Sequence, residues 1–285
     1  MIIKLFDYIS LKLSTLGYRI SLISECLRLS KSKRILPDKY KIEIIKNPNR
    51  FHDFINFLCF LNNNKIINLI DIGANIGNFS RDFLLFYPKC REIVCFEPLQ
   101  FLNEIIEKKI AHKKNLKLTI INKGLSNQKK KQIFFYDKNN TELSSLNQYI
   151  NQYLSSFLNQ FKPSEKMNLE LDLLDNCCKN FSQQKNFIVK IDAQGHELEI
   201  IQGGLKIISR ASIVLLECSF AKQYKNKDHT FSKCANLLSK INLHPIIFQP
   251  RHAGNVLSMH AVERNVIFVK HHLLKKVYYE NYKKL

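Results

Sequence analysis

The sequence predicts an α/β protein built on a doubly wound, mostly parallel sheet, and three observations predict this class. From about residue 65 to 270, short apolar segments of strand length alternate with segments of helical periodicity. The first strand is followed by a turn that contains Gly73 and Gly77, and then by a helix. Four of the strands end in an acidic residue. Strands that alternate with helices form a parallel sheet covered on both faces, so we expect these acids to gather at one edge.

The composition excludes several classes of protein. Of the 285 residues, 45% are hydrophobic, which is too many for a chain that is mainly disordered. Unbroken apolar stretches are only a few residues long, far short of the roughly 20 that a transmembrane helix needs. The first thirty residues hold basic and polar residues throughout, so we expect no cleavable signal peptide. The eight cysteines form no C-x-x-C pair, and we expect reduced thiols in a cytoplasmic protein.

The chain is strongly basic, with 44 Lys and Arg against 24 Asp and Glu and a formal net charge of +20. The lysines are scattered, so one interpretation is a solvated basic surface. The other is a surface for an anionic substrate or for membrane lipid. Because no arginine-rich tract or aromatic–basic signature occurs, we expect no nucleic-acid partner.

Residues 1–62 are predicted to form a helical extension. Apolar residues recur every three or four positions over the first 27 residues, and breaks at Pro37 and Pro48 precede a second apolar helix at Phe51–Leu61. The first helix is amphipathic and basic. It either packs on its own domain or a partner subunit, or makes peripheral contact with a membrane.

A single α/β domain is predicted over residues 63–275. Its expected strands are Ile66–Asp71, Glu92–Glu97, Leu116–Ile121, Phe187–Asp192, Ile213–Glu217, Pro245–Phe248 and Val262–Lys270. Its expected helices are Asn78–Phe86, Phe101–Ile110, Glu197–Ser209 and Phe231–Ile241.

An insertion over residues 125–185 interrupts this alternation. It holds an extra strand or hairpin arm at Gln132–Tyr136 and then a polar segment rich in Asn, Gln and Ser. Insertions in doubly wound sheets lie over the strand ends, where ligands bind. The insertion is therefore either a cap on the substrate side or a decorative loop.

The turn after the first strand is typical of a cofactor site. Gly73 permits a sharp turn and close approach of a ligand, and Gly77 lets the helix start pack against the sheet. Position 75 is asparagine, where a pyrophosphate-binding fingerprint would need a second glycine. The carboxylate of Asp71 would repel a pyrophosphate but suits a cofactor with an ammonium group and a sulfonium, such as S-adenosylmethionine.

The second strand ends in Glu97, 26 residues after Asp71. An acid at this position accepts hydrogen bonds from both ribose hydroxyls of a nucleoside cofactor. NAD enzymes have such an acid too, but Asn75 and Asp71 favour S-adenosylmethionine over NAD.

The segment Val189–Glu199 (VKIDAQGHELE) is the third chemically informative feature. Asp192 ends another apolar strand, across the sheet from Gly73, and would face the crevice at the switch point of the sheet. Lys190 lies between acids and predicts an ion-pair site. His196 is a candidate general base, although a single histidine is more often structural.

The residues after Asp192 also indicate the acceptor atom. Enzymes that methylate the exocyclic amines of bases usually carry an Asp/Asn-Pro-Pro-aromatic motif here, and cytosine-C5 enzymes need a Pro-Cys nucleophile. Asp192–Gly195 (DAQG) has neither, so oxygen is the favoured acceptor.

The chain resembles the FkbM-type methyltransferases, which depend on S-adenosylmethionine and mostly act on hydroxyls. The resemblance covers roughly residues 65–270. It is carried by Asn68–Ser80 (NLIDIGANIGNFS), Val94–Pro98 (VCFEP), Val189–Gly203 (VKIDAQGHELEIIQG) and Ile213–Glu217 (IVLLE), with support from LDLL at 171–174 and NVIFV at 265–269.

The resemblance implies a Rossmann-like, seven-stranded sheet whose last strand is antiparallel. It implies cofactor contacts at Asp71, Gly73, Asn75, Gly77 and Glu97. It places Asp192 at the methyl-transfer crevice, with Glu217 and Glu197 nearby. We predict Asp192, His196 and Glu217 as the catalytic set and expect no metal, although Asp192, Glu217 and Glu197 are oxygen ligands of the kind a divalent cation takes.

The expected function is an S-adenosylmethionine-dependent O-methyltransferase. The expected acceptor is a hydroxyl of a small molecule or glycan, with a sugar of a surface glycan or its precursor favoured. Alternatives are a non-catalytic scaffold that binds the cofactor in glycan biosynthesis, and an RNA ribose methyltransferase, which the positive charge would suit.

Overall fold

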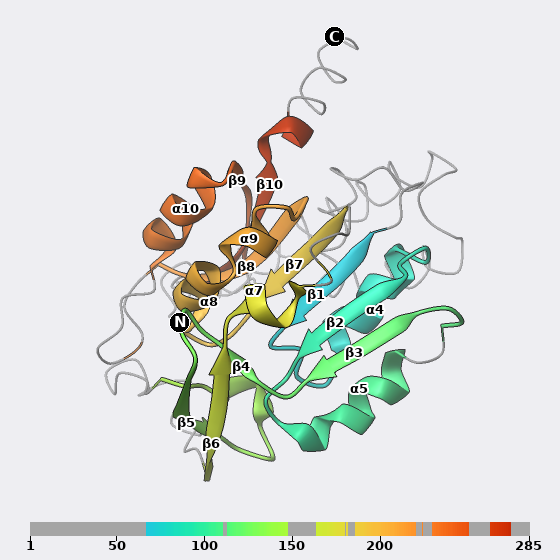
Figure 1. The fold of residues 1–285 in the computed structure, drawn as a ribbon, viewed down its shortest axis with the longest axis vertical. Coiled ribbons are helices and arrows are strands. Elements are labelled where there is room, and N and C mark those ends of the chain that lie inside the picture. The colour runs from blue at the N-terminus through green and yellow to red at the C-terminus, as the bar shows by residue number, and fades with distance from the viewer. Residues whose placement is uncertain are drawn as a thin grey trace, which may run out of the picture.

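A computed structural model describes residues 67–110, 113–147, 164–179, 181, 186–220, 224, 230–250 and 263–274 (Figure 1). The predicted helical extension over residues 1–62 lies outside the described residues, as does its boundary with the α/β domain. No helix among the described residues is long and apolar enough to span a membrane.

A seven-stranded sheet forms the centre of the described structure. Its strands are β1 (Asn68–Ile72), β2 (Glu92–Phe96), β3 (Lys117–Ile121), β7 (Phe187–Ile191), β8 (Ile213–Ser219), β9 (Leu243–Pro250) and β10 (Glu263–Lys270). They are ordered β3-β2-β1-β7-β8-β10-β9. Strand β10 is antiparallel to both of its neighbours, whereas the other pairings are parallel. The predicted doubly wound sheet with an antiparallel last strand is therefore confirmed.

The central strands are mostly apolar and buried along their length because both faces of the sheet are covered. Successive residues of β1 and β7 alternate between two buried clusters. Leu69 and Ile188 belong to the cluster under α4 (Asn78–Phe86) and α5 (Asn103–Ile110). Ile70 and Val189 belong to the cluster under α7 (Leu174–Cys177), α8 (Glu197–Gly203), α9 (Leu205–Ile208) and α10 (Phe231–Lys240). Helix α5 begins with the short 3-10 helix η2 (Gln100–Leu102).

The helix predicted over residues 197–209 is divided into α8 and α9, and two glycines explain the division. A methyl group on Gly203 would lie 2.0 Å from the backbone oxygen of Ser126, so this position has no room for a side chain. Gly204 has φ −125°, outside the helical range, and packs against Leu174. The apolar periodicity of a helix continues through Gly203 and Gly204, but the backbone is not helical at Gly204.

Part of the insertion forms a second, three-stranded sheet, which we call the small sheet. It consists of β4 (Gly124–Leu125), β5 (Lys130–Tyr136) and β6 (Glu165–Asp172), in the order β4-β6-β5. Strand β5 contains the predicted arm at Gln132–Tyr136. Strand β6 is not among the elements predicted from the sequence. Its alternation of Met167, Leu169 and Leu171 with polar residues is nevertheless typical of a strand with one solvent-facing side. Figure 1 shows the small sheet beside the carboxyl ends of β1, β2 and β3.

Candidate functional site

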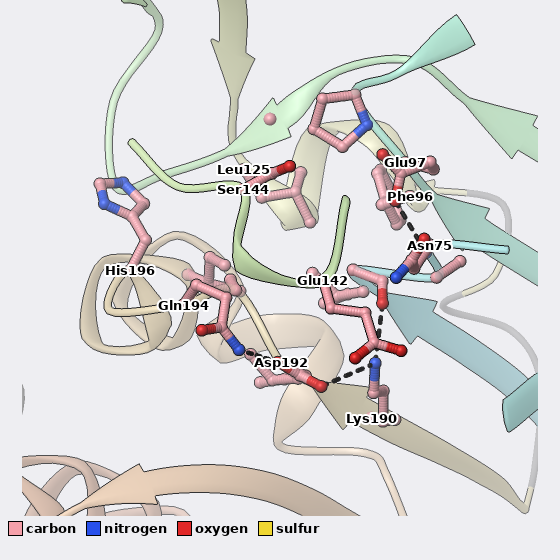
Figure 2. A pocket seen from close by; sticks show the side chains of 18 of the residues that line it. Asn75, Phe96, Glu97, Leu125, Glu142, Ser144, Lys190, Asp192, Gln194 and His196 are labelled. Carbon is pink, nitrogen blue, oxygen red and sulfur yellow. Dashed lines mark hydrogen bonds and ion pairs between the residues drawn. The ribbon is translucent and has the colours of Figure 1, made fainter. Parts of the chain in front are cut away.

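A pocket of about 300 Å³ lies at the carboxyl ends of β1, β2 and β7, with one wall from the small sheet and the loop after it. This volume is at the lower end of the range for small-molecule sites, about 300–1,000 Å³. Figure 2 shows part of its lining. The chemically informative lining residues are Gly73, Asn75, Glu97, Lys123, Thr141, Glu142, Lys190, Asp192, Gln194 and His196.

The turn after β1 is shaped by two glycines in the left-handed region. Gly73 has φ 73°, and a Cβ there would lie 1.9 Å from the backbone oxygen of Asp192. Gly77 has φ 74° and is the N-cap residue before α4, where a Cβ would lie 3.4 Å from the Cα of Ile106. The first glycine brings the ends of β1 and β7 together, and the second brings α4 close to α5.

Glu97 is anchored to the same turn. The backbone N–H of Asn75 donates to Glu97 Oε2 at 2.8 Å, and that of Leu99 donates to Oε1 at 3.0 Å. The side chain is buried, and burial raises the pKa of Glu97 to about 7 against the lowering effect of these two hydrogen bonds. Each carboxylate oxygen has capacity for a second donor, which suits the pair of ribose hydroxyls of a nucleoside cofactor.

Asp71 lies beneath the pocket and does not line it. Its side chain has no exposed area, and the hydroxyl of Ser80 donates to Oδ2 at 2.7 Å. Lys190 Nζ lies 3.5 Å from Oδ1. The structure therefore places Asp71 where it holds the turn and the lysine, and away from direct contact with an ammonium group in the pocket.

Lys190 joins the ends of β1 and β7. Its Nζ donates to the backbone oxygen of Gly73 at 2.8 Å and lies 3.4 Å from Asp192 Oδ2, in addition to its contact with Asp71. Burial alone would lower the pKa of Lys190, but the carboxylates of Asp192 and Asp71 raise it above its usual value. The side chain is thus a buried ammonium that these groups neutralise.

Asp192 is held from two sides but stays open to the pocket. Lys190 contacts one oxygen, and Gln194 Nε2 donates to the other at 3.0 Å. The same amide group donates to Glu217 Oε2 at 2.8 Å. The side chain of Asp192 is 32% exposed, whereas Glu217 is buried behind Gln194 and does not line the pocket.

His196 is buried and faces away from Asp192. Its side chain is 1% exposed, and Nε2 lies 3.1 Å from the hydroxyl of Ser126. Figure 2 shows the ring directed away from Asp192. The structure thus does not bring these two predicted catalytic residues together.

Glu197 stabilises the turn that follows β7. Its Oε1 accepts the backbone N–H groups of Ala193 at 3.0 Å and Gly195 at 3.1 Å. Burial raises the pKa of Glu197 to about 7, opposed by these backbone hydrogen bonds. Glu197 is not part of the pocket lining.

Sequence reasoning missed the residues that tie the loop after β5 to the site. The Thr141 hydroxyl donates to Asn75 Oδ1 at 2.7 Å. The hydroxyl of Ser145 and the amide of Asn147 donate to the backbone oxygens of Gln194 and Gly195, both at 2.6 Å. These residues lie in a polar segment without periodicity, so no local signal in the sequence marks them.

The residues at the pocket fit S-adenosylmethionine. Among the residues that the structure describes, no group of three or more His, Cys, Asp or Glu is placed to hold an ion. A turn shaped by Gly73, a left-handed Asn75 with φ 48°, and the anchored carboxylate of Glu97 form a cradle for a nucleoside with a charged tail. Glu97 would hold the ribose, and Gly73 and Asn75 would lie along the rest of the cofactor.

The strand order, the antiparallel β10 and the acids at the strand ends define a Rossmann-like methyltransferase of class I. A family model described as the methyltransferase FkbM domain matches residues 71–254, well over half of the chain. The chain therefore belongs to the FkbM methyltransferase family and is an S-adenosylmethionine-dependent enzyme. The closing strand, with Asn265–Val269, lies beyond the matched residues.

Solved structures with similar folds are distant in sequence. A TehB-like S-adenosylmethionine-dependent methyltransferase from Corynebacterium glutamicum is 8% identical, with a TM-score of 0.36, 72% of this chain covered and 80% of that chain. A precorrin-6y C5,15-methyltransferase from Geobacter metallireducens is 11% identical, with a TM-score of 0.35 and coverage of 76% and 89%. A search of curated proteins finds no match to this chain.

Proposed function

We propose that this methyltransferase acts on a hydroxyl group, and that its acceptor is a sugar in a surface glycan or its precursor. The observation that carries the proposal is the position of the Asp192 side chain. It is the one carboxylate at the end of β7 that is both fixed by charged and polar neighbours and open to the pocket among the described residues.

Asp192 has the contacts that a proton acceptor for a hydroxyl needs. Lys190 and Gln194 hold its two oxygens, so its position is set before an acceptor arrives. S-adenosylmethionine, when bound, supplies an electrophilic methyl group. Asp192 would orient the acceptor hydroxyl and take its proton as the oxygen–methyl bond forms. Gly73 beside Asp192 keeps the two strand ends close enough for cofactor and acceptor to share one pocket.

Oxygen is favoured over carbon or base nitrogen as the acceptor atom. The lining of the pocket includes no cysteine, so the described residues offer no thiol nucleophile of the kind that base C-methylation requires. The turn Asp192–Gly195 contains no proline and is held by Glu197, Ser145 and Asn147.

An anionic acceptor is favoured by lysines near the pocket. Lys123 lines it, and Lys123 and Lys129 share one partner, Asp172, at 3.8 Å and 3.5 Å. Two ammonium groups on one carboxylate leave net positive charge at this side of the mouth. Acidic glycans and phosphate-linked glycan precursors both match that charge.

The test uses the purified protein with methyl-labelled S-adenosylmethionine and a panel of acidic sugars, nucleotide sugars and lipid-linked glycan precursors. We expect label on a sugar oxygen as an ether, which resists alkali, whereas a methyl ester is released. Asp192→Asn should lower kcat by about a hundredfold or more, with S-adenosylmethionine affinity changed less than about threefold. Asp175→Asn is the matched control, because that acid accepts the backbone N–H of Ile207 outside the pocket.

Full turnover by Asp192→Asn would remove this residue from the reaction. Alkali-labile label would show a carboxyl acceptor. Transfer of label to RNA would support the ribose methyltransferase alternative, as would binding of RNA by the protein that is lost at high salt. Cofactor binding without transfer to any acceptor would favour the scaffold.

A further inference from the structure

Three carboxyl groups line the pocket, and two of them have defined partners. Glu97 accepts backbone N–H groups from Asn75 and Leu99 at the end of β2. Asp192 contacts Lys190 and Gln194 at the end of β7. The third, Glu142, comes from the short 3-10 helix η3 (Thr141–Leu143) that follows β5.

Among the described residues, Glu142 is not held in an ion pair. Its side chain is exposed. Figure 2 shows the carboxylate extending from the η3 side into the pocket. An exposed acid in a cavity of a protein with a formal charge of +20 is available for a positively charged ligand group.

The position of Glu142 is fixed relative to the glycine turn. Its neighbour Thr141 donates a 2.7 Å hydrogen bond to the side chain of Asn75, 66 positions earlier in the sequence. Glu142 therefore lies over the same turn that Gly73 and Asn75 form. The acid that the sequence places at this turn, Asp71, is covered and held by Ser80 and Lys190.

We infer that Glu142 binds the ammonium group of the methionyl part of S-adenosylmethionine and thereby takes the role that the sequence suggested for Asp71. Asp71 and Asp192 offer no equivalent site, since Lys190 already pairs with both carboxylates. The insertion then completes the cofactor site as well as facing the acceptor. The inference rests on the cofactor and is independent of which acceptor is methylated.

The experiment measures the affinity of three ligands by calorimetry. S-adenosylmethionine carries both the ammonium and the sulfonium, S-adenosylhomocysteine keeps only the ammonium, and 5′-methylthioadenosine has neither. For Glu142→Gln we expect binding of the first two to weaken by about tenfold, the size of one charged hydrogen bond, with 5′-methylthioadenosine unchanged. Glu170→Gln is the control, because Glu170 lies on β6, is 61% exposed and is not part of the pocket.

Each other result overturns the inference in a distinct way. Weaker binding of S-adenosylmethionine alone would assign Glu142 to the sulfonium. Unchanged affinity for all three ligands would remove it from the cofactor site, and a raised KM for the acceptor would then place it on the acceptor side. Failure of the unaltered protein to bind S-adenosylmethionine would be a failure of the cofactor assignment itself, which this comparison separates from the role of Glu142.

Discussion

At the residue scale, Lys190 is the side chain that connects the cofactor turn to the acceptor side. One ammonium group contacts Asp71, Asp192 and the backbone of Gly73. Removing one partner of a buried, paired charge typically costs 3–5 kcal/mol, because the remaining charges lose their compensation. The ion-pair site predicted around this lysine is therefore a support for both functional strand ends.

Glu97 should make cofactor binding depend on pH. Its pKa is raised to about 7 in the free protein, and ribose hydroxyls donate to the ionised form. Affinity for S-adenosylmethionine should therefore rise by about tenfold between pH 6 and pH 8. Calorimetry in buffers of different ionisation enthalpy should detect proton release near pH 6. Glu97→Gln should bind more weakly and lose the pH dependence.

Glu197→Gln provides the matched control for this pH profile. Burial raises the pKa of Glu197 to the same value, but the residue lies outside the pocket lining. This variant should retain the tenfold increase. An affinity that is flat between pH 6 and pH 8 in the unaltered protein would contradict the role of Glu97. Because both acids have raised pKa values, the stabilisation from their neutral forms is lost as the pH rises through about 7.

At the element scale, local pattern predicted the large sheet well and the small sheet poorly. The strands with Asp71, Glu97 and Asp192 at or just beyond their ends are mostly apolar and buried along their whole length, as in a sheet covered on both faces. The contacts of Thr141 and Asn147 join positions 48 to 66 residues apart. Such contacts depend on tertiary packing. They cannot be predicted from a polar segment that has no periodicity.

The junction of α8 and α9 should tolerate no side chain at position 203. A methyl group there would meet the backbone oxygen of Ser126, and the Ser126 N–H is itself bonded to Asp172 at 2.8 Å. Gly203→Ala should therefore destabilise the fold by about 1–3 kcal/mol, as overpacking does. Denaturant unfolding would measure the change.

Gln202→Ala is the neighbouring control for this measurement. Gln202 is exposed and accepts only a surface hydrogen bond from Asn127 among the described residues. Its replacement should change the free energy of unfolding by about 0.5 kcal/mol or less. Equal stability of the two variants would show that the backbone near Ser126 moves freely.

At the scale of the whole molecule, the pocket is a joint product of two sheets. The large sheet supplies the turn after β1 and the acids at the ends of β2 and β7. The small sheet and the loop after β5 supply the opposite wall. Phe134 and Leu169 of the small sheet also pack into the cluster that covers one face of the large sheet. A ligand in the pocket therefore contacts both parts.

Binding of S-adenosylmethionine should protect the small sheet from hydrogen exchange. A ligand held by both sheets makes any opening reaction that separates them less favourable, by about 2.7 kcal/mol at 100 times its Kd. Exchange in β5 and β6 should slow by up to about a hundredfold, measured by mass spectrometry. Peptides from β9, which does not line the pocket, should be unaffected. Protection confined to the ends of β1 and β2 would show that the small sheet takes no part.

Asn75 and Gln194 are the two pocket residues other than glycine that adopt positive φ, at 48° and 47°. This conformation is unfavourable for residues with a side chain, and it persists here because Thr141 holds Asn75 while Asp192 and Glu217 hold Gln194. The free-energy cost of these positive φ angles is therefore met when the protein folds and not when a ligand binds. Both turns consequently enter the binding equilibrium already ordered, so a ligand need not supply their ordering entropy, and selectivity depends on fit to a preorganised receptor.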